Sequence, residues 1–441
     1  MKHEALDRFF SEKGVYLFDG GMGSMLQNKG LSPGQPPERM SLEQPKVVQD
    51  VHRKYIEAGA DLIETNTFGG NRAVLSRYGL EDKIEEINKI AAEVALEVAP
   101  SDVKVVGSIG PTGHLLAPLG EIDQDQVEKI YYEQSQILIN SGINLVNVET
   151  MNDLRELKAA VIAARSCGLS VMAEATIMDN GYTLSGASAE VIIATLEALG
   201  VVAGGLNCGL GPTELRPVIK RMSKVSLLPL VLQPNAGLPQ VIDEETVYPL
   251  TAERFGEKMR AIIEEAHPRI IGGCCGTTPE HIKVLRSIID SLPSNLLQAT
   301  QEKTDKPILI AGRGKTVNWN KNWDEYAFLE VKPINCKTIQ TPQGTADDLF
   351  SVITLLKKNK IELVRLDLSC WEAEPSEIKK FIQEFQLYFT GPFSVKGNKI
   401  EILSEFFHYY LGKPLYESTQ SPVPASIMEC IDKYLPGTII C

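Results

Sequence analysis

Short apolar runs rich in β-branched residues alternate with longer amphipathic segments through the first 290 residues. Runs of this length, bounded by turn residues, are typical of buried strands. Strands that are buried on both faces and separated by helices indicate a parallel sheet. The pattern predicts eight strands, at Val15–Asp19, Asp61–Asn66, Lys104–Ser108, Asn144–Glu149, Ser170–Thr176, Val202–Asn207, Pro229–Gln233 and Arg269–Gly272.

The segments between these strands have the spacing of helices that bury one face. Eight strand–helix units favour a closed (β/α)8 TIM barrel over an open doubly wound sheet. Gly20, Gly21 and Gly23, which follow the first strand, lack the spacing of a Rossmann dinucleotide fingerprint. The predicted helices are Pro45–Ala58, Ile84–Val98, Gln126–Ser141, Asp153–Ser166, Ala189–Leu199, Pro212–Met222 and Ala252–Glu265.

A second, smaller α/β domain is predicted after the barrel. Residues 296–306 are polar and without clear period, which indicates a linker between a barrel at 1–295 and an accessory domain at 307–441. The accessory domain is too short for a second complete barrel, so a truncated or degenerate barrel is one form open to it. Its predicted strands and helices are Ile308–Ala311, Phe328–Val331, Ala346–Asn359, Leu363–Leu368, Pro375–Phe385, Phe393–Lys396, Ile400–Leu411 and Ala425–Tyr434.

Charge and cysteine content narrow the class of protein. The formal net charge of −13 argues against a nucleic-acid partner, which would demand a basic surface. Met1–Ser11 lacks the apolar stretch of a signal peptide, and no apolar run is long enough to cross a bilayer. Without an export signal the 8 cysteines are expected to be reduced. We therefore expect a cytoplasmic protein that has no membrane or nucleic-acid partner.

Polar residues gather where the predicted strands end. In a barrel the carboxyl ends of all strands share one face, and active sites are built there. Residues distant in sequence should therefore converge on one funnel. They are Asp19, Asn66, Glu149, Cys208, Asn235, Cys274 and Cys275.

Three cysteines in glycine-rich turns predict a metal site. Cys274 and Cys275 follow Gly272-Gly273, and both thiolates can reach one soft metal ion. Cys208 supplies a third sulfur. Zinc bound by three sulfurs keeps one coordination position open, as catalytic zinc sites do. The alternatives are a structural zinc, or buried cysteines without a metal.

The motifs around these residues resemble those of the homocysteine S-methyltransferase family, which includes the homocysteine-binding module of cobalamin-dependent methionine synthase. The resemblance covers roughly residues 1–295. It implies a zinc-binding barrel that takes homocysteine as substrate. The matching segments are Leu17-Phe18-Asp19-Gly20-Gly21-Met22-Gly23, Ala60 through Phe68, Ile109-Gly110-Pro111-Thr112-Gly113, Gly205 through Pro212, Gln233-Pro234-Asn235-Ala236-Gly237 and Ile270 through Pro279.

The resemblance also implies substrate contacts. It places Asp19 and Glu149 around homocysteine and Asn235 near the zinc, either in the open position or hydrogen-bonded to a ligand. Asn66 and Thr67 match the family's Thr-Asn-Thr-Phe motif. The residues alone leave other roles open: Asp19 as a turn or helix cap, Glu149 as a helix N-terminal residue, and Asn235 as a turn residue. Glu64, a polar residue in an apolar run, is either an active-site acid or simply paired.

The reaction expected from such a site is methyl transfer to the homocysteine thiol, giving methionine. Zinc deprotonates a bound thiol, and the thiolate is the nucleophile. The segment Pro37-Glu38-Arg39-Met40-Ser41-Leu42 resembles the methionine synthase type, which implies methylcobalamin carried by a separate corrinoid protein. S-methylmethionine and betaine are alternative donors, although the absence of tryptophan before Trp319 weakens an aromatic cage for betaine. A zinc-binding assembly subunit without catalysis is the alternative of another class.

Overall fold

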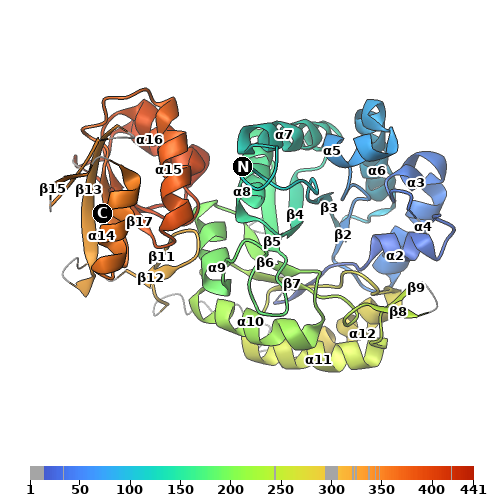
Figure 1. Cartoon of the computed structure of the whole chain (residues 1–441). Coiled ribbons are helices and arrows are strands. Elements are labelled where there is room, and N and C mark those ends of the chain that lie inside the picture. Colours follow the sequence, from blue (N-terminus) through green and yellow to red (C-terminus); the bar gives the residue numbers. More distant parts are fainter. Residues whose placement is uncertain are drawn as a thin grey trace. The chain divides into compact units, whose positions relative to one another are not determined.

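The computed structural model describes residues 14–293 and 306–441, except for residues 33, 243–244, 320–321, 323–324, 336–337, 343, 347 and 419. The chain divides into two compact units (Figure 1). The first comprises Met1–Ser185 and Val201–Thr304, and the second Gly186–Gly200 and Asp305–Cys441. Residues 296–305 of the predicted linker lie outside the described residues, so the predicted domain boundary stays a prediction.

The first unit contains the predicted barrel. Eight strands pair in parallel in the order β1-β10-β7-β6-β5-β4-β3-β2. Hydrogen bonds from Asp61 N to Leu17 O (2.7 Å) and from Asp19 N to Leu62 O (3.0 Å) then join the first and last strands, so the sheet closes. The strands are β1 (Tyr16–Leu17), β2 (Leu62–Glu64), β3 (Lys104–Ile109), β4 (Leu145–Met151), β5 (Ser170–Ala175), β6 (Ala203–Asn207), β7 (Leu230–Gln233) and β10 (Ile270–Ile271).

Helices of the first unit begin where the sequence provides caps. Asp153 and Thr251 accept hydrogen bonds from the first turns of α8 and α11, and proline stands at the start of α4, α10 and α12. Helix α12 and the hairpin β8–β9 were not predicted. The helices are α2 (Met22–Gln27), α3 (Arg39–Glu43), α4 (Pro45–Glu57), α5 (Arg72–Leu75), η1 (Ser76–Tyr78), η2 (Glu81–Lys83), α6 (Ile84–Val98), α7 (Gln124–Asn140), α8 (Leu154–Ser166), α10 (Pro212–Val225), α11 (Ala252–Ala266) and α12 (Pro279–Asp290), and the hairpin pairs β8 (Gln240–Ile242) with β9 (Glu245–Val247).

The barrel interior is filled in layers. One buried apolar layer takes a side chain from every strand: Tyr16, Phe18, Leu62, Val106, Leu145, Met172, Ala203, Val231 and Ile270. Because side chains alternate along a strand, the next inward positions lie two residues further on. They are mostly polar: Glu64, Ser108, Asn147, Glu174 and Gln233. The barrel therefore has an apolar floor and a polar layer directly above it, toward the carboxyl ends of the strands.

One buried side chain in the outer helices predicts an acid sensitivity. His52 on α4 is fully buried, and among the described residues neither ring nitrogen finds a hydrogen-bond partner. Burial lowers the pKa of His52 from 6.5 to about 4. The unfolded chain therefore binds this proton first, and folding stability falls as the pH drops from about 6.5 to about 4, by about 3 kcal/mol.

This loss should be absent from His52→Leu. We expect urea unfolding in the presence of a chelator to show about 3 kcal/mol less pH dependence between pH 7 and pH 4.5 for the variant than for the wild type. His114→Gln, at an exposed position, is the control and should keep the wild-type dependence. Equal pH dependence in wild type and His52→Leu would contradict the prediction.

The second unit is a mixed α/β sheet. Its order is β15-β14-β13-β16-β17-β18-β19, in which β13 to β19 are parallel and β14 and β15 antiparallel. The parallel strands follow one another in chain order with helices between them, as in a segment of a barrel. A separate hairpin pairs β11 with β12. The strands are β11 (Leu309–Ala311), β12 (Thr316–Asn318), β13 (Phe328–Asn335), β14 (Thr338–Thr341), β15 (Gly344–Ala346), β16 (Leu363–Asp367), β17 (Phe393–Lys396), β18 (Leu415–Glu417) and β19 (Ile439–Ile440).

The second unit also includes a helix from the barrel's part of the sequence. Helix α9 (Ala189–Ala198) stands between β5 and β6 in the chain, yet it groups with residues 305–441. Lys413 Nζ lies 2.6 Å from Glu197 Oε2, and Gly437 N donates to Ala198 O (3.0 Å).

An aromatic core lies among α15, α16 and β17. The other helices are α14 (Leu349–Lys358), α15 (Ser376–Tyr388), α16 (Ile400–Tyr409) and α17 (Ala425–Tyr434).

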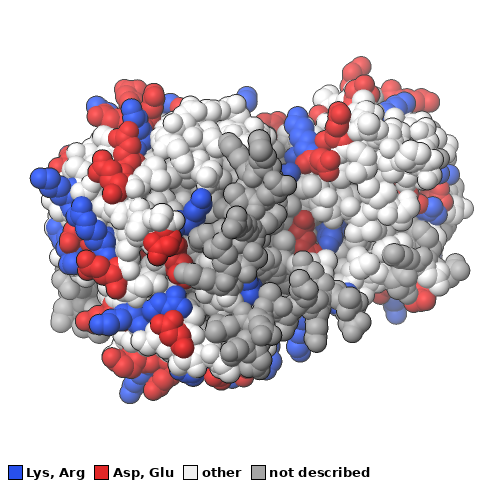
Figure 2. Space-filling view, turned by 180° about the vertical axis from the view of Figure 1, so that it is seen from behind, with Lys and Arg blue, Asp and Glu red and all other residues white. Residues whose placement is uncertain are grey.

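Acidic and basic side chains are interspersed in small groups on the face shown in Figure 2. The negative net charge is thus spread over that face rather than gathered in one patch. Among the described residues, no helix is long and apolar enough to span a bilayer.

Candidate metal and substrate site

The three predicted cysteines converge at the carboxyl ends of β6 and β10. Cys208 Sγ and Cys275 Sγ lie 3.8 Å apart, and Cys274 Sγ and Cys275 Sγ 3.9 Å apart. All three sulfurs lie within 4.8 Å of one another. Sulfur ligands at about 2.3 Å from a tetrahedral zinc ion are about 3.8 Å from each other. The cluster therefore fits a single zinc ion bound through three thiolates.

Local backbone geometry presents these sulfurs. Cys208 has a φ of 56°, a left-handed conformation that is uncommon for a residue with a side chain. Gly276 has a φ of 77°, which glycine adopts without strain and which lets the chain turn directly after Cys275. Cys274 N donates to Pro234 O (2.9 Å), and Cys275 N donates to Asn235 Oδ1 (3.1 Å). The β7 loop thus supports the cysteine pair.

The thiols also differ in acidity. Hydrogen bonds from Cys208 and then from Cys274 lower the pKa of Cys275 to about 3. The neighbouring thiols therefore favour the thiolate form of Cys275, and a thiolate is the form that binds metal.

Asp19 and Glu149 lie close to this cluster and are buried. Asp19 Oδ2 accepts a hydrogen bond from Glu64 N (3.0 Å), and its carbonyl accepts one from Gly273 N (3.1 Å). It does not cap α2, because the N-cap residue there has no side-chain hydrogen bond. Glu149 accepts from Ser108 Oγ (2.6 Å). Glu149 is not the cap of α8 either, since Asp153 fills that position.

A buried carboxyl network extends below these two acids. Asn147 Nδ2 donates both to Glu64 Oε1 (2.9 Å) and to Glu174 Oε2 (2.7 Å), and Gln233 Nε2 also donates to Glu174 Oε2 (2.7 Å). Burial raises the pKa of Glu149 to about 7 and that of Glu174 to about 8. Burial, followed by repulsion from Glu149, raises the pKa of Glu64. A cation bound here would stabilise the ionised carboxylates.

Asn235, Asn66 and Thr67 all lie at strand ends, and each has a side-chain polar atom that is hydrogen-bonded to another residue of the chain. Asn235 uses its Oδ1 for the Cys275 N–H described above. Asn66 Nδ2 donates to Pro37 O (2.8 Å) and Ser41 Oγ (3.0 Å), and Thr67 Oγ1 donates to Ser108 O (2.7 Å). These contacts fix the loop after β2. Direct contact of the three residues with substrate stays a prediction.

Three residues near the site were missed by sequence reasoning. Asn207 Nδ2 donates to Glu149 Oε2 (2.9 Å), which connects that acid to the residue before Cys208. Glu174 is a polar residue within a buried strand, the same pattern that had marked Glu64, so the sequence offered a way to find it. Tyr248 lies next to Cys275 and directly follows hairpin β8–β9, which was not predicted. The sequence around Tyr248 contains no motif that would have indicated a role at the site.

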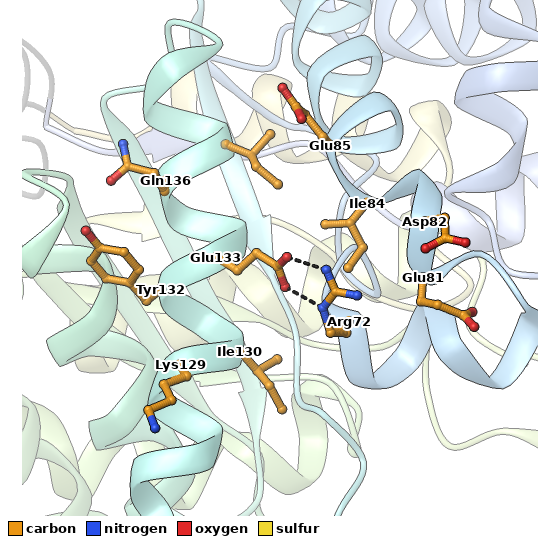
Figure 3. Close-up of a pocket in the computed structure, with 11 residues that line it drawn as sticks. Arg72, Glu81, Asp82, Ile84, Glu85, Lys129, Ile130, Tyr132, Glu133 and Gln136 are labelled. Carbon is orange, nitrogen blue, oxygen red and sulfur yellow. Dashed lines mark hydrogen bonds and ion pairs between the residues drawn. The ribbon is translucent and has the colours of Figure 1, made fainter.

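A groove of about 720 Å³ between the outer helices is separate from this chemistry (Figure 3). Arg72 and Glu133 form a two-pronged ion pair across it. The groove contains no cysteine or histidine among its lining residues. It therefore lacks the thiolate chemistry of the site at the strand ends.

Three converging thiols and buried acids at the carboxyl ends of the strands define a (β/α)8 barrel with a site that could hold a metal ion. The homocysteine S-methyltransferase family profile matches residues 16–289. The chain therefore belongs to the homocysteine S-methyltransferase family.

Known relatives agree with this membership. The chain is 36% identical to a methionine synthase of Mycobacterium leprae over 293 residues, which is 62% of this chain and 24% of that protein. It is 32% identical to a methionine synthase of Mycobacterium tuberculosis over 346 residues, 72% of this chain and 29% of that protein. The chain thus matches 24% and 29% of the length of these two relatives.

The fold also has solved counterparts. The metallated homocysteine methyltransferase MmuM of Escherichia coli superposes with a TM-score of 0.55 at 22% identity, over 65% of this chain and 99% of that protein. At this identity the likeness supports the barrel fold. The (β/α)8 prediction is confirmed.

Proposed function

We propose that this chain transfers a methyl group to the thiol of homocysteine, giving methionine, with zinc held by Cys208, Cys274 and Cys275. The convergence of the three sulfurs is the observation that carries the proposal. Bound zinc would supply Lewis acidity that keeps a substrate thiol deprotonated at neutral pH. Residues 1–295 form the catalytic module in this proposal, and residues 307–441 an accessory domain.

The acids beside the cysteines support an amino-acid substrate. Asp19 and Glu149 are buried, and burial raises the pKa of both. An ammonium group placed between them would offset their desolvation and hold the substrate by charge-assisted hydrogen bonds. Asn207 orients Glu149 toward the cysteine side of the funnel. The site thus provides for both ends of an α-amino thiol, its ammonium and its sulfur.

The donor we propose is methylcobalamin on a separate corrinoid protein. Exposed apolar side chains occupy the loops that follow the barrel strands: Phe68, Leu115, Leu119, Met178 and Leu238. Apolar side chains exposed together around a site are typical of interaction surfaces. A partner that brings a large cofactor to the mouth of the barrel would cover them.

Because the cysteines must stay reduced to bind zinc, we also propose that the protein acts in the cytoplasm.

Elemental analysis together with X-ray absorption at the zinc edge tests the proposal. We expect one zinc ion per chain with three sulfur neighbours, rising to four when homocysteine is added, because the substrate thiol takes the open position. 3-Aminopropane-1-thiol, which lacks only the carboxyl group of homocysteine, and propane-1-thiol, which also lacks the ammonium, serve as matched probes of the acids. A chain without zinc, or four sulfurs without substrate, would contradict the proposal.

The methyl donor needs an assay of its own. Zinc-loaded protein is incubated with homocysteine and either methylcobalamin, S-methylmethionine or betaine, and methionine is measured. We expect product with methylcobalamin. Product with S-methylmethionine or betaine alone would replace the corrinoid donor while leaving the homocysteine reaction intact.

A further inference from the structure

Tyr248 lies against the cysteine cluster and has no part in the function proposed above. Of the three thiols in the cluster, Cys275 interacts with the Tyr248 hydroxyl most strongly, and Cys208 and Cys274 follow. A phenol hydroxyl of ordinary acidity carries its proton at neutral pH and can donate a hydrogen bond to a thiolate sulfur.

The backbone on both sides holds Tyr248 in this place. Ala236 N donates to Cys275 O (3.0 Å), and Leu250 N donates to Ala236 O (3.0 Å). The ring of His281 contacts Leu250 O through Nε2 (3.1 Å), which ties the same segment to α12. The segment that follows hairpin β8–β9 is therefore joined by hydrogen bonds to the turn that presents the cysteines.

The ring of Tyr248 packs on the turn itself. A Cβ atom added at Gly276 would lie 2.2 Å from Cγ of Tyr248. Two features therefore favour glycine at position 276: its φ of 77°, which residues with a side chain rarely adopt, and the aromatic ring, which leaves no room for a Cβ atom. The side chain of Tyr248 is only partly buried, so solvent reaches part of it beside the cysteine turn.

We propose that Tyr248 is a positioning residue of the zinc site, whose hydroxyl donates to Cys275 Sγ and fixes the orientation of that sulfur while its ring shields the sulfur from water. This inference rests on the proposed zinc function. Three thiolates give a divalent ion a net negative surrounding, and a hydrogen-bond donor next to one sulfur offsets part of that charge. Partners that orient metal ligands typically contribute 10–100-fold to metal affinity or activity.

The test compares Tyr248→Phe with wild type after loading with cobalt(II), whose absorption reports on thiolate ligands. Phenylalanine keeps the ring over Gly276 and removes only the donor. We expect the thiolate-to-cobalt absorption band to shift, and competition with a chelator to show metal binding weakened about 10-fold. Tyr132→Phe, which removes the hydroxyl of a tyrosine exposed on α7, is the control and should behave as wild type.

The outcomes separate the two proposals. Wild-type protein that binds cobalt through sulfur, together with a Tyr248→Phe variant of unchanged band and affinity, would overturn the role of Tyr248 and leave the zinc site standing. Wild-type protein without thiolate-to-cobalt absorption would overturn the zinc function, and this inference with it. A shift in Tyr248→Phe but not in Tyr132→Phe supports both.

Discussion

Cys208→Ala is expected to lose zinc and to transfer methyl groups at least about 100-fold more slowly than wild type. Removing one of three sulfurs leaves two protein ligands, fewer than the three that catalytic zinc sites use. Without zinc, a substrate thiol of ordinary pKa near 8.5 is mostly protonated at neutral pH and is a weak nucleophile. The measurements are zinc per chain after dialysis and the rate of methionine formation from homocysteine.

Cys167→Ala is the matched control for this experiment. Cys167 follows α8, and burial raises its pKa to about 11, so it is a poor ligand. This variant should keep its zinc and its rate. A Cys208→Ala protein that retained both zinc and full activity would rule out the three-sulfur site. Loss of activity with zinc retained would place Cys208 in another role.

The barrel and the cysteine site were predictable from sequence because two regularities act together. Buried parallel strands give apolar runs of recognisable length, and the carboxyl ends of those strands lie on one face. Cys208 and Cys274, which are far apart in sequence, could therefore be placed together from strand positions alone. The structure brings their sulfurs within 4.8 Å.

The parts that escaped prediction lack such regularities. Strands β8 and β9 have three residues each, too few for a period of two to be recognised. Tyr248 follows that hairpin and was missed with it. Glu64 was noticed in its apolar run, but whether it was paired could not be known before Asn147, from another strand, was placed beside it. Partners across strands depend on register, which a single sequence does not reveal.

Helix α9 is a similar case. Its apolar pattern predicted a barrel helix, and the helix forms at Ala189–Ala198. It groups with residues 305–441, and its Glu197 pairs with Lys413, which lies more than two hundred residues away in sequence. From sequence alone, a lysine and a glutamate are each expected at the surface. Only the structure shows that these two are buried and paired with each other.

Lys413→Met is expected to destabilise the second unit by about 3–5 kcal/mol. Lys413 Nζ and Glu197 Oε2 are 2.6 Å apart, and the two side chains are only 5% and 7% exposed. Removing the ammonium leaves a carboxylate buried without that partner, and the cost of desolvating the carboxylate is no longer offset. All three tryptophans of the sequence follow residue 305, and the two that the structure describes, Trp319 and Trp371, are buried in this unit. Tryptophan fluorescence in a urea titration therefore follows its unfolding directly.

A double-mutant cycle shows whether the loss comes from the pair. Lys413→Met combined with Glu197→Leu should recover most of the stability, because apolar replacement of a whole buried ion pair is often neutral. Lys332→Ala is the control for an exposed pair in the same unit: the Lys332 and Glu330 side chains are 40% and 34% exposed, and the change should stay within about 1 kcal/mol. Equal losses in Lys413→Met and in the double variant would show that the loss does not come from removing the charge partner of Glu197.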